Sequence, residues 1–280
     1  MKHIVIASDS FKGSLSSEEV AESVSKGIER CMSGCRITCI NVADGGEGTV
    51  EAMVSSLNGH IEETAVSDPL GRPIKARYGI AGDTAIIEMA AASGLPLLKP
   101  TERNPWKTST RGTGELILDA CRKGCRKFLI GIGGSATNDG GTGMLEALGV
   151  TFKDADGRVI SGCCGGILHE IMDIDMSGMN PEVKESSFIV ACDVDTVFCG
   201  PDGAAAVFAP QKGADKEMTK AEFVAFLNAE TAKIAKTGKY NIKRDCNYTK
   251  NIDVGGATGI LNGIISAIDE NSNLDTVVGD

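Results

Sequence analysis

HIVIASDSFKGSLSSEEV, residues 3–20, and CRITCINVADGGEGTVEAM, residues 35–53, decide the fold class of this chain. Each stretch begins with a short β-branched apolar run, continues through polar residues and glycines, and ends in apolar residues spaced as on one helix face. Strand, loop and helix in succession predict an α/β fold with a parallel sheet. Such sheets place ligands beyond the carboxyl ends of their strands, so we expect a site at loops 9–14 and 44–49.

The sequence pattern changes after Glu62. Residues 63–91, ETAVSDPLGRPIKARYGIAGDTAIIEMAA, contain turn signals that separate short strand-like runs, which predicts the start of a second domain. Further along, TGELILDACRKG has helical spacing, KFLIGIGG is typical of a buried strand, and TFKDADGRVI predicts a hairpin. A strand is also expected at SSFIVACDVD, residues 186–195.

Composition limits the class of partner. The 280 residues carry a formal net charge of −10 and no block of Lys or Arg, which argues against nucleic-acid binding and favours a small-molecule partner. The sequence shows neither a signal peptide nor a membrane-spanning run, so we expect no membrane partner. Ten cysteines in a long chain of this kind are expected to be reduced, which predicts a cytoplasmic protein.

Two of the glycine loops combine acids with small residues. Phosphoryl transfer needs N–H groups or cations around phosphates, carboxylates for a metal, and a group that orients the attacking hydroxyl. In DSFKGS, residues 9–14, Lys12 is the candidate cation and the small residues of the loop allow close approach of an anion; the candidates there are Ser10, Gly13 and Ser14. A capped turn with a solvated lysine is the alternative.

ADGGEGT, residues 43–49, offers Asp44 beside Gly45 and Gly46. A carboxylate next to exposed backbone suits a metal or hydroxyl contact, although acids at this position also cap helices. In ACDVD, residues 191–195, Asp193 and Asp195 lie two apart and would share one face of an extended strand. Such a pair suits Mg²⁺, with capping again as the alternative.

The longest glycine-rich stretch is GIGGSATNDGGTG, residues 131–143. It follows a predicted buried strand and is typical of an anion-binding loop; the candidate residues are Gly133, Gly134, Ser135, Thr137, Asn138 and Asp139. Residues 131–136 also match GxGxxA, which leaves a nicotinamide-dependent oxidoreductase as an alternative, although no acid lies at the ribose-binding spacing.

Taken together, these stretches resemble the type-1 glycerate kinase family. DSFKGSLS, ADGGEGT, DPLGRP, AIIEMAAASGL, TSTRGTGELI, GIGGSATNDGG, ACDVD and FAPQKGA occur in the order of that family, from residue 1 to about 215. The resemblance implies phosphorylation of D-glycerate by ATP and Mg²⁺, with the 2-hydroxyl as the expected acceptor. It also implies a Rossmann-like domain, residues 1–62 and 253–280, split by a larger inserted α/β domain, residues 63–252.

The same resemblance leads us to expect an incomplete first domain, because the family continues through a Gly-Glu-Gly-Arg-Leu-Asp motif and further strands. A remnant that binds ligand without turnover is therefore a second hypothesis. The oligomeric state stays open, with a homodimer as one option.

The expected roles follow from the chemistry of each group. Lys12 is expected to neutralise negative charge on the transferred phosphoryl group. Asp44 is expected to orient or deprotonate the glycerate hydroxyl, and Asp193 to hold Mg²⁺. The opposite assignment of the roles of Asp44 and Asp193 is the alternative. A guanidinium fork fits a carboxylate, so Arg72 or Arg111 is expected at the glycerate carboxylate.

Overall fold

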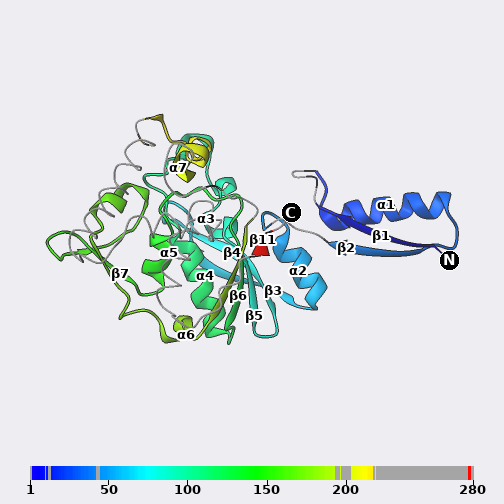
Figure 1. Ribbon diagram of the computed structural model, residues 1–280, viewed down its shortest axis with the longest axis horizontal. Helices are drawn as coiled ribbons and strands as arrows, with labels where there is room; N and C mark the ends of the chain where they lie inside the picture. The colour runs from blue at the N-terminus through cyan, green and yellow to red at the C-terminus, as the bar shows by residue number, and fades with distance from the viewer. Residues whose placement is uncertain are drawn as a thin grey trace, which may run out of the picture.

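The computed structural model describes residues 2–9, 11, 14–41, 45–192, 196, 203–216, 218 and 277–278. The first unit contains the parallel strands β1 (His3–Ser8) and β2 (Arg36–Asn41), joined by helix α1 (Ser17–Cys31). Ser16 caps α1 by accepting a hydrogen bond from the Glu19 N–H, and the Glu19 carboxylate bonds the Ser16 N–H in return. The predicted strand, loop and helix order is confirmed. Figure 1 shows this unit projecting from the larger body on the side of α2.

The larger body is built on a mixed six-stranded sheet. Its order is β11-β10-β6-β5-β4-β3, with β3, β4 and β5 antiparallel and β5, β6, β10 and β11 parallel. The α/β class predicted from the sequence is therefore confirmed. The strands are β3 (His60–Ser67), β4 (Pro73–Ala81), β5 (Thr84–Glu88), β6 (Lys127–Gly131), β10 (Ser187–Cys192) and β11 (Val277–Val278).

Side-chain alternation gives the two faces of this sheet different partners. Ile86 points to helix α2 (Thr49–Leu57), where it packs with Val50 and Val54. Its neighbour Ile87 points to the opposite face and joins the main core. That core includes helices α4 (Arg111–Arg122) and α5 (Thr142–Ala147). Strand β5 is therefore buried on both faces, as expected for a strand within a parallel part of a sheet.

A three-stranded sheet of order β8-β7-β9 lies beyond α5. Strands β7 (Thr151–Lys153) and β8 (Val159–Ile160) form the hairpin predicted at DADG, and β9 (Asp173–Asp175) pairs with β7. The remaining short elements are α3 (Ala90–Ser93), η1 (Leu95–Leu97), η2 (Pro100–Glu102), η3 (Gly165–Glu170), α6 (Pro181–Lys184), α7 (Ala204–Phe208) and η4 (Pro210–Lys212).

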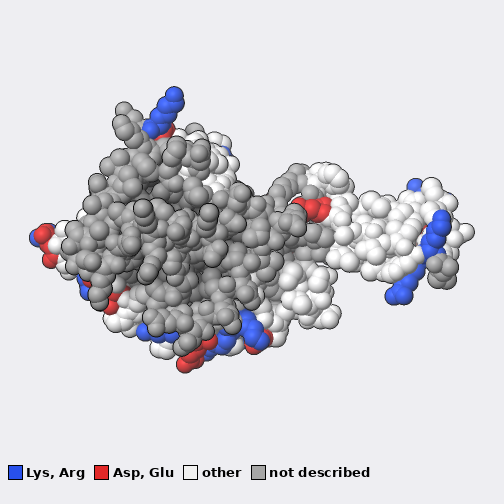
Figure 2. Space-filling view, viewed as in Figure 1, with Lys and Arg blue, Asp and Glu red and all other residues white. Residues whose placement is uncertain are grey.

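The expected domain boundaries stay a prediction. Strand β3 begins at His60 and belongs wholly to the larger sheet, and β11 pairs with β10 in that sheet. Within the described ranges, no helix is both long and apolar enough to cross a membrane. Figure 2 shows Lys and Arg side chains beside Asp and Glu along the lower edge of the larger body. Lys123 and Glu62 form one of the ion pairs of this body.

Burial of Ile86 provides a test of the packing of α2. Ile86→Ala is expected to lower the free energy of unfolding by about 2–5 kcal/mol, because it opens a cavity between α2 and the sheet. Ile189→Ala on β10 is the matched control, since Ile189 is 40% exposed and its loss should be below about 1.5 kcal/mol. Urea unfolding measures both, and equal losses would contradict this packing.

Candidate functional site at the carboxyl ends of β5, β6 and β10

Three parallel strands end side by side in the larger sheet. Glu88 at the end of β5 is in register with Gly131 at the end of β6, which is in turn in register with Ala191 near the end of β10. Open α/β sheets bind ligands at this edge. The loop 131–143 leaves β6 there, as the sequence predicted.

The loop that follows β2 crosses the same edge. The Gly133 N–H donates a hydrogen bond of 3.3 Å to the Gly45 carbonyl. A Cβ at Gly131 would clash with that carbonyl, and a Cβ at Gly133 would lie 2.9 Å from the Gly46 Cα. The backbones of two loops 85 or more residues apart are therefore in direct contact, and only glycine permits this approach.

Glu88 bonds the start of helix α2, where the loop that follows β2 ends. Its Oε1 accepts a 2.9 Å hydrogen bond from the Val50 N–H in the first turn of α2. Burial raises the pKa of Glu88, while N–H groups of the same turn oppose the rise. Sequence reasoning did not select Glu88, because its partner lies 38 residues upstream.

The loop that follows β6 is held by hydrogen bonds to the segment after β5. The Ala136 N–H donates to the Ser93 carbonyl at 2.8 Å, and the buried Thr108 hydroxyl donates to the Ala136 carbonyl at 3.0 Å. Gly134 is exposed in this loop, whereas Gly133, Ser135 and Asn138 are partly buried. The loop therefore has a defined shape with part of its backbone accessible.

Thr137 is the unusual member of this loop. It is 1% exposed, and its hydroxyl oxygen is buried without a hydrogen-bond partner. An unsatisfied buried hydroxyl costs about 1–3 kcal/mol, so it calls for an explanation. A hydroxyl that bonds a ligand oxygen is one, and it fits the predicted anion-binding role.

Lys212 was missed by sequence reasoning. Its side chain comes from η4 and is 5% exposed, and its Nζ donates to the Ser135 hydroxyl at 2.8 Å and to the Thr137 carbonyl at 2.6 Å. The only local signal was its place in FAPQKGA, one of the stretches that carry the family resemblance.

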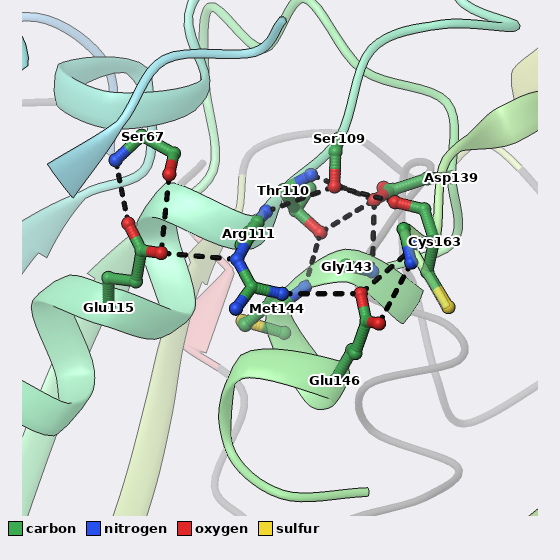
Figure 3. A network of polar contacts seen from close by, with 11 residues as sticks. Ser67, Ser109, Thr110, Arg111, Glu115, Asp139, Gly143, Met144, Glu146 and Cys163 are labelled. Atoms are coloured by element: carbon green, nitrogen blue, oxygen red, sulfur yellow. Dashed lines mark hydrogen bonds and ion pairs between the residues drawn. The ribbon is translucent and has the colours of Figure 1, made fainter. Parts of the chain in front are cut away.

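Asp139 is fully occupied by donors of the protein itself. Figure 3 shows its carboxylate beside Thr110 and Gly143. It accepts hydrogen bonds from the N–H and hydroxyl of Thr110 and from the N–H groups of Gly141 and Gly143, at 2.8–3.2 Å. Burial raises the pKa of Asp139, and these bonds oppose the rise. The contacts favour a structural role for this carboxylate at the start of α5.

Arg111 and Arg72 both lie in ion pairs. Arg111 bonds Glu115 at 3.2 Å and Glu146 at 3.4 Å, and Glu115 also accepts from Ser67 (Figure 3). Arg72 bonds Asp68 at 2.5 Å and Glu102 at 2.8 Å. Each guanidinium is about half-exposed and already faces carboxylates, so a glycerate carboxylate there would compete with these groups.

The predicted catalytic and metal residues Lys12, Asp44, Asp193 and Asp195 lie outside the described residues, as do Ser10 and Gly13. Ser14 is exposed and donates its N–H to the Phe11 carbonyl at 2.8 Å. Among residues the structure describes, no group of three or more His, Cys, Asp or Glu is placed to hold a metal. The roles of these residues stay predictions.

These features define an α/β protein with a glycine-lined site at the carboxyl ends of parallel strands. Comparison with known sequences gives the family: the pattern of the glycerate kinase family matches residues 4–272, and the chain belongs to this family. Membership agrees with a kinase and disfavours the nicotinamide alternative.

Named relatives are consistent with this assignment. The chain is 51% identical to a glycerate kinase of Bacillus subtilis over 217 residues, which cover 77% of this chain and 56% of the relative. It is 50% identical to a glycerate 2-kinase of Escherichia coli, covering 77% of this chain and 57% of the relative. The chain thus spans little more than half the length of these relatives.

A solved structure supports the fold. It is described as a glycerate kinase 2 from Salmonella typhimurium LT2 and matches with a TM-score of 0.81 at 40% sequence identity. The match covers 99% of this chain and 72% of that chain.

Contact between the two loops can be tested at Gly131. Gly131→Ala is expected to lower the free energy of unfolding by about 1–3 kcal/mol, because the added methyl group pushes the Gly45 carbonyl away. Gly27→Ala in α1 is the control: nothing lies near its Cβ, and Ala favours a helix by up to about 1 kcal/mol. Denaturant unfolding compares the two, and a neutral Gly131→Ala would contradict the loop contact.

Glu88 and Glu19 are expected to affect the pH dependence of stability with opposite signs. The pKa of Glu88 is raised from 4.5 by burial, so the native state keeps this proton to higher pH than the unfolded chain does. The stability of wild type relative to Glu88→Gln should therefore fall as pH rises above 4.5.

The pKa of Glu19 is lowered from 4.5 by its hydrogen bonds to Ser16. Its contribution is present above 4.5, so the stability of wild type relative to Glu19→Gln should fall as pH decreases below that value. Urea unfolding at a series of pH values between about 3 and about 7 measures both slopes. If the stability difference between wild type and variant changed with pH in the same direction for Glu88→Gln and Glu19→Gln, the opposite pKa shifts of the two carboxyl groups would be contradicted.

Proposed function

We propose that this chain transfers the γ-phosphoryl group of ATP to D-glycerate in the presence of Mg²⁺, with 2-phosphoglycerate as the product. The observation that carries the proposal is the contact of the Gly45–Gly46 backbone with Gly131 and Gly133 at the carboxyl ends of β6 and β10. Phosphoryl transfer depends mainly on positioning and on electrostatic stabilisation, and glycine backbone at a strand end supplies close N–H donors for both.

In the proposed reaction, the 2-hydroxyl oxygen of glycerate attacks the γ-phosphorus of ATP. A new P–O bond forms to glycerate, the bond to ADP breaks, and the hydroxyl proton passes to Asp44. The loop from Gly133 to Asn138 binds phosphate or glycerate oxygens through N–H groups and hydroxyls, and Lys12 stabilises negative charge on the transferred group.

The metal is proposed at Asp193, with Asp195 as a second ligand, because Mg²⁺ prefers carboxylates combined with phosphate oxygens and water. Bound at these carboxylates, Mg²⁺ would reduce the negative charge on the phosphate groups. A cytoplasmic location and, as one option, a homodimer complete the proposal.

A second candidate function is ligand binding without turnover. It is kept because the described loop after β6, with the accessible Gly134 backbone and the Thr137 hydroxyl, offers groups that bind an anion without taking part in its turnover. The two candidates differ in product formation, whereas both predict that ligand raises the melting temperature.

The deciding assay incubates the 1–280 chain with D-glycerate, ATP and Mg²⁺, and follows ADP by a coupled assay and the product by ³¹P NMR. The expected product is 2-phosphoglycerate. Asp44→Asn and Asp193→Asn should each lower kcat by about a hundredfold or more, and only the metal ligand should also shift the Mg²⁺ dependence. Stabilisation by ligand without product would establish the binding-only function, and unchanged turnover in both variants would reject the assigned roles.

A further inference from the structure

Lys212 links a distant segment to the glycine loop that follows β6. Its Nζ donates to Ser135 Oγ at 2.8 Å and to the Thr137 carbonyl at 2.6 Å, across 77 and 75 residues of sequence. The side chain is buried, at 5% exposure. Burying an ammonium group costs several kcal/mol before its interactions compensate, so a lysine in this position is under strong physical constraint.

The backbone that carries Lys212 is itself fixed. The Lys212 N–H and the Ala214 N–H both donate to the Ala209 carbonyl at 3.0 Å, and the Gly213 N–H donates to Pro210 at 3.0 Å. Ala209 is completely buried. The ammonium group is therefore delivered from a rigid turn rather than from a freely moving side chain.

Lys212 holds one side of the loop and the segment after β5 holds the other. Ser135 and Thr137, which bond Lys212, flank Ala136, which bonds Ser93 and Thr108. Between these attachments lies the Thr137 hydroxyl, buried and without a partner. The loop is thus fixed through its other groups while this hydroxyl stays available for hydrogen bonding.

We infer that Lys212 is a positioning residue that holds Ser135 and Thr137 in the arrangement that binds phosphate oxygens of a nucleoside triphosphate. The inference rests on the proposed function and deepens it by assigning the nucleotide phosphates to the loop that follows β6. Lys212 acts through this loop, and no direct contact with the reacting atoms is required.

The test measures the Kd of Mg²⁺-ATP by isothermal titration calorimetry at a temperature where circular dichroism shows every variant folded. Lys212→Met removes the charge and the donors at nearly constant volume and should raise the Kd about tenfold or more. Lys212→Arg keeps the charge and donors in a different geometry and should raise it only about threefold.

Lys184→Met is the matched control. Lys184 is exposed and donates to a single carbonyl, that of Ser177 at 3.3 Å, so its loss removes the same charge without touching the loop. Its Kd should equal that of wild type. A purely structural Lys212 would lower the melting temperature but leave the Kd of the folded protein unchanged, which would overturn the inference.

The outcomes separate this inference from the kinase proposal. A wild-type chain that binds ATP but forms no phosphoglycerate rejects the kinase proposal, while the Kd ratios still decide the role of Lys212. A wild-type chain that does not bind ATP overturns both. Where Lys212→Met does not fold, Lys212→Arg and Ser135→Ala replace it, and wild-type affinity in both of them overturns the inference.

Discussion

Backbone contact between Gly45–Gly46 and Gly131–Gly133 is the constraint on which the candidate site depends. It joins the loop after β2 to the loop after β6, and a Cβ at Gly131 or Gly133 would separate them. The loop after β2 leads into α2. Glu88 accepts a hydrogen bond from the first turn of this helix, and the apolar face of the helix covers Ile86. One close approach thus connects the N-terminal unit, the covering helix and the strand ends.

Charged groups around this contact serve mainly to position the backbone. The Asp139 carboxylate accepts four hydrogen bonds near the start of α5. The Glu88 carboxylate accepts one from the first turn of α2. By contrast, the guanidinium groups of Arg72 and Arg111 are about half-exposed, so solvent screens their ion pairs more than it screens the buried carboxylates. Buried acids rather than surface pairs therefore define the shape of the site.

The sequence predicted those features that are encoded locally. Apolar runs and helical spacing located β1, α1, β2, β6 and α4. The spacing of apolar residues does not encode the order of strands in a sheet. The mixed sheet, with β3 and β4 antiparallel, could therefore not be predicted from the sequence. Glu88 and Lys212 were missed for the same reason: their hydrogen-bond partners lie 38 to 77 residues away, so spacing does not reveal the contacts.

Net charge explains why the site is built from local groups. A net charge of −10 disfavours long-range attraction of the anionic ligands that we propose for this chain. Attraction must then come from short-range donors: the N–H groups of the glycine loops, a hydroxyl such as that of Thr137, and cations held close to them. Lys212 contributes to this arrangement by holding Ser135 and Thr137 in place, through its hydrogen bonds to the Ser135 hydroxyl and the Thr137 carbonyl. In the proposed site, the loop after β6 would supply such donors, because it combines the accessible Gly134 backbone with the Thr137 hydroxyl, which has no hydrogen-bond partner among the described residues.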